Sequence, residues 1–190
     1  MPLILRVEEV FDAATDDAQF DMLSTKLAAV LGARSGVIHW RLNEGEEEQE
    51  VSYSGHFSSE DMAKLERGFA HDDIWADAVN APHALNRVWR LQDLVPQAKY
   101  ERSRIYNEWI RSIGDDTMHA LGTVIHTPEF RVELGFHRGR FQPEFDAETV
   151  ARLSHYLPSI RRMILIRQRL RAERRGAASV ALDQIAHACF

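Results

Sequence analysis

The stretch that decides the fold is residues 100–138, YERSRIYNEWIRSIGDDTMHALGTVIHTPEFRVELGFHR. In its first part, Ile105, Trp109 and Ile113 recur at intervals of four residues. This spacing places them on one apolar face and predicts an amphipathic helix. Gly114 follows, and a glycine at this position commonly ends a helix.

The second part of the stretch holds two apolar segments rich in β-branched residues, 118–127 and 130–137. Only Pro128 and Glu129 stand between them. A connection this short leaves no room for a crossover helix, so the two segments are predicted to form an antiparallel hairpin. A helix that leads into a central hairpin is typical of small sensory domains.

The N-terminal residues predict two helices. Spaced apolar residues indicate a short helix over 3–13 and a second helix that ends at about Leu31. Asp16 or Asp17 caps the second helix, because an aspartate side chain accepts hydrogen bonds from the first free backbone N–H groups of a helix.

Two strands are predicted next, at 35–42 (SGVIHWRL) and 51–55. The alternation of side chains along a strand divides the first into two faces, with Val37, His39 and Arg41 on one and Ile38, Trp40 and Leu42 on the other. The two strands are predicted to pair with each other, and the run NEGEEEQE at 43–50 between them is interpreted as a solvated turn.

A further helix begins at Ser58, which is a favourable cap. Residues 71–89, HDDIWADAVNAPHALNRVW, are then predicted to form a long irregular loop. Loops of this length in compact domains are often functional. Residues 91–99 are expected to add a short helical turn.

The last long helix is predicted to start at the cap Asp146, to be kinked by Pro158 and to end at Gly176. The domain core covers only one side of such a helix, so a residual apolar stripe is expected to form a homodimer interface. The residues of this interface are Leu153, Leu157, Ile160 and Ile164. The seven arginines between 161 and 175 are interpreted as a solvated face, with a phosphate-binding surface as the alternative.

The expected domain organisation has three parts: a sensory α+β domain at 1–145, a long dimerisation and signalling helix at 146–175, and a helical tail at 176–190. The fold class is α+β, with an antiparallel sheet of about five strands flanked by helices, as in GAF and PAS-like sensors.

Composition narrows the functional classes. The chain of 190 residues is 45% hydrophobic and 27% charged, and its net charge of −6 argues against a chain-wide nucleic-acid surface. The one cysteine, Cys189, leaves no internal disulfide to form, which fits a reducing compartment. Neither a signal peptide nor a membrane span is recognisable, so a cytoplasmic location is expected.

Several segments together resemble the N-terminal sensory region of LuxR-type helix-turn-helix transcriptional regulators. They are YERSRIYNEWIRSIG, MHALGTVI, LGFHR and FDAETVARLSHYLPSIRRMILIRQRL, and the resemblance covers about residues 15–185. It implies a sensory domain that binds a small molecule, forms a homodimer and reaches DNA only through a helix-turn-helix that the chain lacks. The chain is then either truncated or a stand-alone sensor. The W-x-Y-D pattern of lactone-binding quorum sensors is not matched, so that ligand is not carried over.

The aromatic residues are the best candidates for a ligand pocket, because tryptophan and tyrosine combine an apolar body with a polar group. A cavity is expected between the sheet and the segment from 58 to 109. The predicted ligand-binding residues are Trp40, Tyr53, Trp75, Trp89, Tyr106, Trp109 and His119. His119 is included because it and His137 could face one cavity. No metal-binding spacing of histidines, G-x-G-x-x-G or P-loop is present, so neither a metal nor another cofactor is expected.

Three functions remain in competition. The first is a ligand-binding sensory domain, which the resemblance and the aromatic residues favour. The second is a small hydrolase that uses a histidine and a carboxylate near the irregular loop, although no G-x-S-x-G motif is present. The third is a ligand-free partner that heterodimerises with a full-length regulator. The absence of a catalytic motif makes a non-enzymatic function the prediction.

Overall fold

The computed structural model describes residues 4–43 and 49–188, with side chains described as far as Gly176. The elements in chain order are α1 (Val7–Asp12), α2 (Asp17–Leu31), β1 (Ser35–Leu42), β2 (Gln49–Tyr53), α3 (Ser59–Gly68), η1 (Ala70–Asp72), α4 (Ile74–Asn80), β3 (Trp89–Arg90), α5 (Leu91–Leu94), α6 (Gln97–Tyr100), η2 (Ile105–Ile110), β4 (Thr117–His126), β5 (Phe130–Gly139) and α7 (Ala147–Ala188). The middle of the predicted acidic turn and Cys189 lie outside the described residues.

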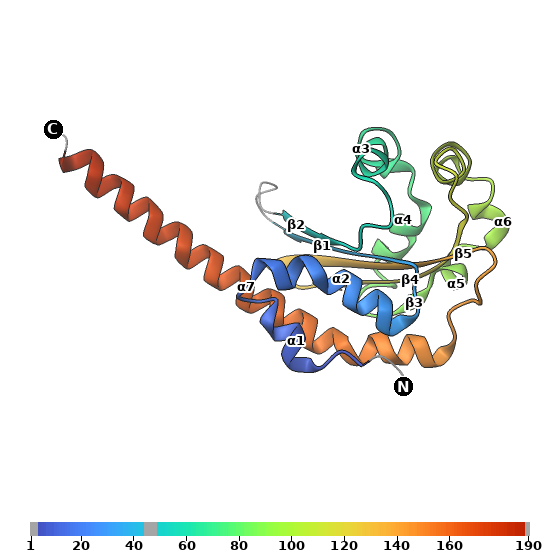
Figure 1. Cartoon of the computed structure of the whole chain (residues 1–190), viewed down its shortest axis with the longest axis horizontal. Helices are drawn as coiled ribbons and strands as arrows, with labels where there is room; N and C mark the ends of the chain where they lie inside the picture. Colours follow the sequence, from blue (N-terminus) through green and yellow to red (C-terminus); the bar gives the residue numbers. More distant parts are fainter. Residues whose placement is uncertain (1–3, 44–48, 189–190) are drawn as a thin grey trace.

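An antiparallel five-stranded sheet forms the middle layer of the molecule, with helices on both faces (Figure 1). Its strand order is β2-β1-β5-β4-β3. The predicted hairpin is confirmed as the pair β4 and β5, and the backbone N–H of Thr127 donates to the carbonyl of Phe130 at 3.0 Å across its turn. The predicted pairing of β1 with β2 is also confirmed, and the α+β fold class with it.

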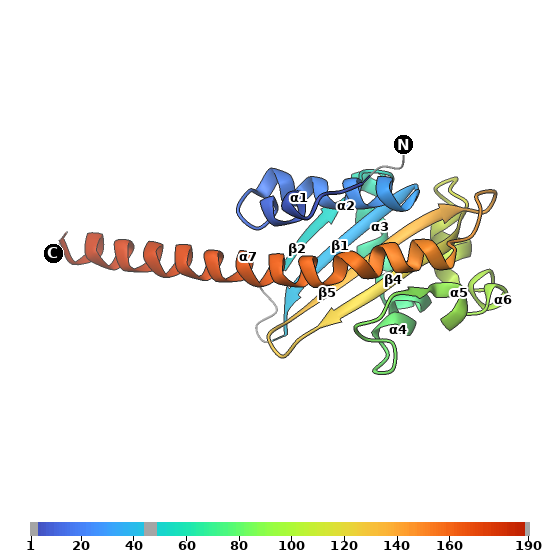
Figure 2. The same cartoon turned by 90° about the horizontal axis from the view of Figure 1, so that it is seen from below.

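Helices α1, α2 and α7 cover one face of the sheet (Figure 2). The side chains of this layer and the sheet form the main core, whose largest fully buried members are Phe20, Trp40, Phe130, Phe136 and Phe145. The hydroxyl of Tyr156 in α7 donates to the carbonyl of Leu5 at 2.9 Å, so the long helix also holds the N-terminal segment in place.

The stripe on α7 that was predicted to form a homodimer interface belongs to this core. Leu153 and Ile160 are 0% exposed, Ile164 is 1% exposed, and Leu157 is partly buried against the same cluster. The assignment of Leu153, Ile160 and Ile164 to a dimer interface is therefore wrong, whereas the assignment of the partly exposed Leu157 stays a prediction. An amphipathic helix turns its apolar stripe towards its own sheet when that sheet presents an apolar face.

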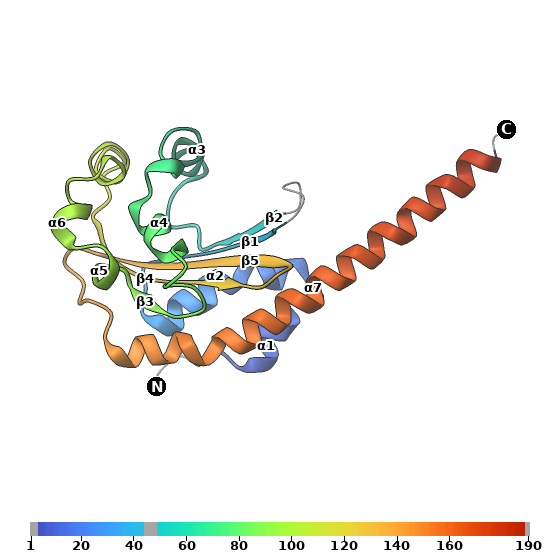
Figure 3. The same cartoon turned by 180° about the vertical axis from the view of Figure 1, so that it is seen from behind.

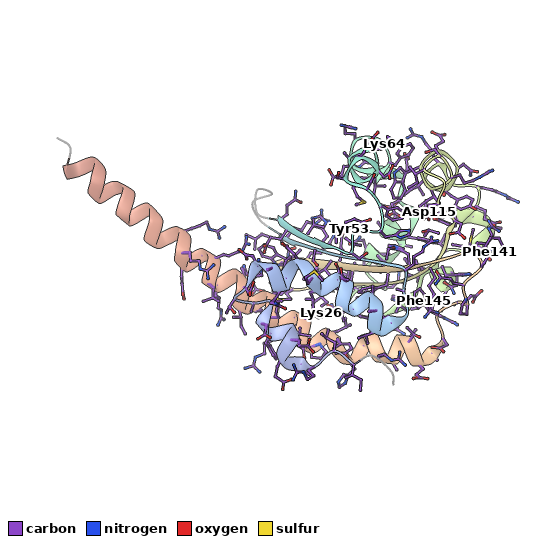
Figure 4. The ribbon with its side chains drawn as sticks, in the orientation of Figure 1. Lys26, Tyr53, Lys64, Asp115, Phe141 and Phe145 are labelled. Carbon is purple, nitrogen blue, oxygen red and sulfur yellow. The ribbon has the colours of Figure 1, made fainter. Side chains whose placement is uncertain are left out.

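Helices α3, α4, α5 and η2 lie on the opposite face and form a second, smaller cluster around Trp75, Tyr100 and Trp109. Figure 4 shows the division, with Tyr53 and Asp115 on the α3 side of the sheet and Phe145 on the α7 side. The two faces of one sheet therefore have separate cores.

Part of the segment expected to be an irregular loop is helical. Asp73 caps α4, and its Oδ1 atom accepts hydrogen bonds from the backbone N–H groups of Trp75 at 3.0 Å and Ala76 at 3.1 Å. Trp75 and Val79, four residues apart, are the buried side of this helix. The expectation was wrong here because a helix this short shows only a single apolar repeat in the sequence.

Two other helices differ from the expectation. η2 is a π-helix, in which the N–H of Arg111 donates to the carbonyl of Tyr106 at 3.1 Å. Helix α7 is capped by Asp146 as predicted and contains Pro158, but it continues through Gly176. An exposed glycine costs a helix only about 1 kcal/mol, which does not end it. The distal part of α7 extends away from the sheet (Figure 3).

Within the described ranges, no helix combines the length and the apolar character needed to cross a membrane.

Candidate functional site

A cavity of about 440 Å3 lies between the sheet and the layer that contains α3, α4 and η2. Its volume is within the range of small-molecule sites, roughly 300–1,000 Å3. Much of its lining is apolar and includes Val37, Val51, Phe57, Met62, Leu65, Val79, Leu91, Ile105, Ile110 and Leu134. A cavity was predicted in this position, between the sheet and the segment from 58 to 109.

The floor of the cavity comes from the two central strands. β1 contributes Val37 and His39, and β5 contributes Glu133, Gly135 and His137. Residues two positions apart point to the same face of a strand, so each set forms a row. His39 lies opposite Glu133 and Val37 lies opposite Gly135. Gly135 carries no side chain, and a Cβ atom there would lie 3.3 Å from the side chain of Val37, so the glycine lets Val37 pack closely against the middle of the floor.

Two tryptophans form part of the roof. Trp75 of α4 stacks on Tyr100 with ring centroids 3.8 Å apart, and its ring is 6.3 Å from that of His137. Trp109 of η2 is fixed by a hydrogen bond of 3.0 Å from its Nε1 atom to the carbonyl of Asp61. The Nε1 atom of Trp75 is buried and has no hydrogen-bond partner among the described residues. A donor left unpaired beside a cavity is available to a ligand.

His137 occupies one end of the floor. Its Nδ1 atom lies 3.0 Å from Oγ of Ser35, and its side chain lines the cavity together with Thr117. Burial lowers the pKa of His137 to about 4, so the imidazole is neutral near pH 7. This end of the cavity therefore offers a neutral hydrogen-bonding group.

Asp73 lines the cavity at the start of α4. Burial raises its pKa above the ordinary value for an aspartate, although the two backbone N–H groups of the helix cap act in the opposite direction. A carboxyl group in this position can accept a hydrogen bond from an N–H or O–H group of a ligand.

Glu133 and His39 form a polar pair at the other end of the floor. Nδ1 of His39 is 3.8 Å from the carboxylate of Glu133, and Arg41 donates to the same carboxylate at 3.0 Å. Burial tends to raise the pKa of Glu133, but the neighbouring His39 and the charge of Arg41 outweigh it and hold this pKa below its usual value. The carboxylate of Glu133 in turn raises the pKa of His39.

A second polar network closes the end of the cavity near Thr117. Asp115 accepts hydrogen bonds from Arg34 at 2.9 Å and from the backbone N–H of Thr117 at 2.7 Å, and its Oδ2 atom lies 2.9 Å from Nε2 of His56. Burial tends to raise the pKa of Asp115, but these hydrogen bonds hold it below its usual value. The network joins the starts of β1 and β4 to the segment that follows β2.

Three of the residues predicted to bind a ligand, Tyr53, Trp75 and Trp109, are brought together in the lining of the cavity. Trp40 is not, because β1 turns it to the opposite face, where it is 1% exposed in the main core. His119 also points away from the cavity, on the face that β4 shares with Leu121.

The other two predicted residues lie close to the cavity without lining it. Trp89 donates from Nε1 to the carbonyl of Ala84 at 3.0 Å, and Tyr106 is buried with its hydroxyl 2.7 Å from the guanidinium of Arg140. Both side chains form hydrogen bonds within the domain and pack in the second cluster, so they support the residues that cover the cavity.

Several lining residues were not predicted, among them His39, Asp73, Asn80, Tyr100 and Glu133, and His137 was expected to face a cavity but was not counted among the ligand-binding residues. For His39 the signal was present, because strand alternation placed it on the face of Val37 and opposite to Trp40. For Glu133 and His137, the alternation of side chains along the second strand of the hairpin would likewise have placed both on one face. Asn80 and Tyr100 carry no local signal, since their positions depend on how the short helices pack.

Catalytic and metal-binding arrangements were also sought. Ser35 pairs with His137, but Ser35 is 1% exposed and is not part of the cavity lining. A substrate in the cavity therefore does not meet this hydroxyl. Across the described part of the chain, no group of three or more His, Cys, Asp and Glu side chains is arranged to hold a metal ion.

The fold of this chain, unlike its sequence, has counterparts among known proteins. No protein-family model matches the sequence, and no curated protein does so either. The solved structures similar to this chain are ligand-binding domains of LuxR-type transcriptional regulators, which confirms the resemblance at the level of the fold.

Two of these structures carry the comparison. The VqsR LBD domain from Pseudomonas aeruginosa is 15% identical, with a TM-score of 0.57, and the match covers 85% of this chain and 96% of that one. The N-acylhomoserine lactone dependent LuxR-family transcription factor CepR2 from Burkholderia cenocepacia is 17% identical, with a TM-score of 0.53, and the match covers 83% and 90%.

Proposed function

We propose that this chain is a cytoplasmic sensory domain that binds a small molecule in the cavity and transmits binding to helix α7. The observation that supports this most is the cavity itself, about 440 Å3 in volume, on a fold shared with regulator ligand-binding domains. An apolar lining with a few polar groups at defined positions is the usual composition of such a site.

A route from the cavity to α7 is available through β2. Gln49 lines the cavity and contacts His39 at 3.0 Å between Oε1 and Nε2. The next residue, Glu50, accepts hydrogen bonds from Arg167 of α7 at 2.7 and 2.8 Å. Arg167 also donates to the carbonyl of Ala13 at 3.0 Å and is 3% exposed. A ligand that displaces the start of β2 would therefore alter the anchoring of α7.

The proposal keeps the homodimer but not its original interface. The stripe from Leu153 to Ile164 is buried in the domain, whereas the distal part of α7 extends away from it (Figure 3). An isolated helix is only marginally stable in water, so the projecting part gains from contact with a second copy. DNA is contacted, in this proposal, by a separate helix-turn-helix unit and not by the elements described above.

The hydrolase alternative receives less support. His39 and Glu133 lie side by side in the cavity, but the hydroxyl nearest to a cavity histidine belongs to the inaccessible Ser35. A cavity histidine and carboxylate whose hydrogen-bonded hydroxyl, that of Ser35, is outside the cavity lining fit ligand recognition better than hydrolysis.

The decisive experiment asks whether occupation of the cavity stabilises the protein. Thermal unfolding is followed with and without 1-octanol, an amphipathic probe, because a ligand that binds only the folded state stabilises it by about 2.7 kcal/mol at a hundred times its Kd. Ala76→Leu adds three carbons inside the cavity and is expected to abolish the stabilisation.

The control is Asp77→Leu, which places the same leucine side chain on the exposed side of the same helix, outside the cavity, and should leave the response intact. If 1-octanol fails to stabilise the wild-type protein, or if Ala76→Leu responds as the wild type does, the proposed function is contradicted.

A further inference from the structure

The cavity floor has a polar group at each end and an apolar middle. His137 and Thr117 are at one end, Val37 and Gly135 are in the middle, and Glu133 and His39 are at the other end. His137 and Glu133 are four positions apart along β5, a span of about 13 Å in a strand. A ligand that extends along this floor meets polar groups twice.

The Glu133 end can both donate and accept hydrogen bonds. His39 and Gln49 lie beside the carboxylate of Glu133, and Asn80 borders the same cavity from α4. The Oδ1 atom of Asn80 is buried and has no hydrogen-bond partner among the described residues, while its Nδ2 atom donates to the carbonyl of Ala76 at 2.9 Å. A hydrocarbon tail placed here would cover these groups without satisfying them, which is unfavourable.

The charges around this end argue for an uncharged ligand group. Among the described residues, no lysine or arginine lines the cavity, whereas the carboxyl groups of Glu66, Asp73 and Glu133 do. An anionic group would meet these carboxyl groups with no cation to pair with. A cationic group has little to gain, because Arg41 and His39 already neighbour the carboxylate of Glu133.

We propose that the Glu133, His39 and Asn80 side chains form a second polar subsite, which binds an uncharged hydrogen-bonding group, such as a hydroxyl, at the far end of the ligand. The inference rests on the proposed function, since it assumes that the cavity is occupied by a ligand. The class of ligand is then a medium-length molecule with polar groups at both ends and an apolar middle.

The test compares four probes by isothermal titration calorimetry with the wild-type chain: 1-octanol, 1,8-octanediol, 8-hydroxyoctanoate and 8-amino-1-octanol. We expect 1,8-octanediol to bind about two- to tenfold more tightly than 1-octanol, which corresponds to one additional net hydrogen bond. The two charged probes should bind more weakly than the diol, because each places a charge where the cavity does not compensate it.

The double variant His39→Leu with Glu133→Leu removes the subsite and should abolish the preference for the diol while 1-octanol still binds. The control Asp77→Leu makes the same carboxylate-to-leucine change on the exposed side of α4, outside the cavity, and should keep the preference. If the double variant does not fold, Asn80→Leu carries the same prediction.

The outcomes separate the two proposals. Equal affinity of the wild-type protein for 1-octanol and the diol, tighter binding of a charged probe, or a preference that survives removal of the subsite would overturn the inference and leave the sensory function standing. If none of the four probes binds, the proposed function fails, and the inference fails with it.

Discussion

The two faces of the sheet differ in how completely they are packed. On the α7 face, the side chains of Phe20, Trp40 and Ile160 are at most 1% exposed, and the core continues from helix to sheet. On the opposite face, the helices leave a cavity of about 440 Å3. The difference separates the two faces: one holds the domain together, and the other retains a cavity at the expense of packing.

The buried polar groups divide in the same way. The cavity face carries Asp73, Glu133, His39 and His137, all of which titrate with shifted pKa values. On the α7 face the buried charged residue among those described is Arg167, which is paired with Glu50. Perturbed ionisable groups gathered in a cavity are typical of functional sites.

The largest expected effect tests the packed face. Changing Ile160 and Ile164 together to Glu places two unpaired charges in the main core, and we expect a loss of more than about 5 kcal/mol, enough to unfold the chain. Circular dichroism and sedimentation would show an unfolded or aggregated protein. The control Ala151→Glu, on the exposed side of α7, should stay folded. A folded monomer from the double variant would instead restore the dimer role that the sequence predicted for these residues.

A comparison of two tryptophans sharpens the contrast between the faces. Trp40→Ala opens a hole in the main core and should cost about 4–5 kcal/mol, near the upper end for such changes. Trp75 is 7% exposed and borders existing space, so it loses fewer contacts, and Trp75→Ala should cost about 2–3 kcal/mol.

Urea unfolding of the two tryptophan variants measures the difference. Equal losses would mean that the cavity face is as tightly packed as the other. A loss near zero for Trp75→Ala would agree with the loop position inferred from the sequence and not with a stacked residue in α4.

The smallest of these effects is a pH dependence that comes from the cavity face. Burial lowers the pKa of His137 to about 4, below its usual 6.5, so between these values the unfolded chain binds a proton that the folded protein does not. Stability should therefore fall as the pH decreases from 6.5 to 4, by roughly 2–3 kcal/mol from this residue.

The variant His137→Gln isolates the contribution of this residue. Denaturant unfolding of both proteins at several pH values should give curves that diverge above about pH 4 and become parallel above about pH 6.5. Protonation of carboxylates such as Glu133 and Asp115 also destabilises the folded protein in acid. These groups are present in both proteins, so their contributions cancel in the difference between the two stability curves. Parallel curves across the whole range would show that His137 is not the group responsible.

Strand alternation was a better guide than residue type to which side chains line the cavity. Within 35–42, it divided the side chains correctly, with His39 and Val37 on the cavity face and Trp40 on the other. The pocket prediction pooled the aromatic residues without using this division, and so it included Trp40 and His119 and omitted His39 and Glu133. A tryptophan serves a core and a pocket equally well, so its type does not tell them apart.

The sequence alone determined the parts of this protein that depend on local patterns. The hairpin of β4 and β5 follows from alternation and a two-residue turn, helix α2 from its cap and spacing, and the start of α7 from Asp146. These features are set by residues a few positions apart, where steric preferences and backbone hydrogen bonds act without help from the rest of the chain.

Only the tertiary structure decided which apolar surface is core, where space remains and which polar groups share it. The stripe of α7 reads equally as a dimer interface or as a core face until the sheet is in place beneath it. His39 and Glu133 become neighbours only because β1 pairs with β5 in one register. The cavity depends on how short helices such as α4 pack above the part of the sheet that contains Gly135. Whether this packing fills the space or leaves it open depends on contacts between distant segments, which no local pattern encodes.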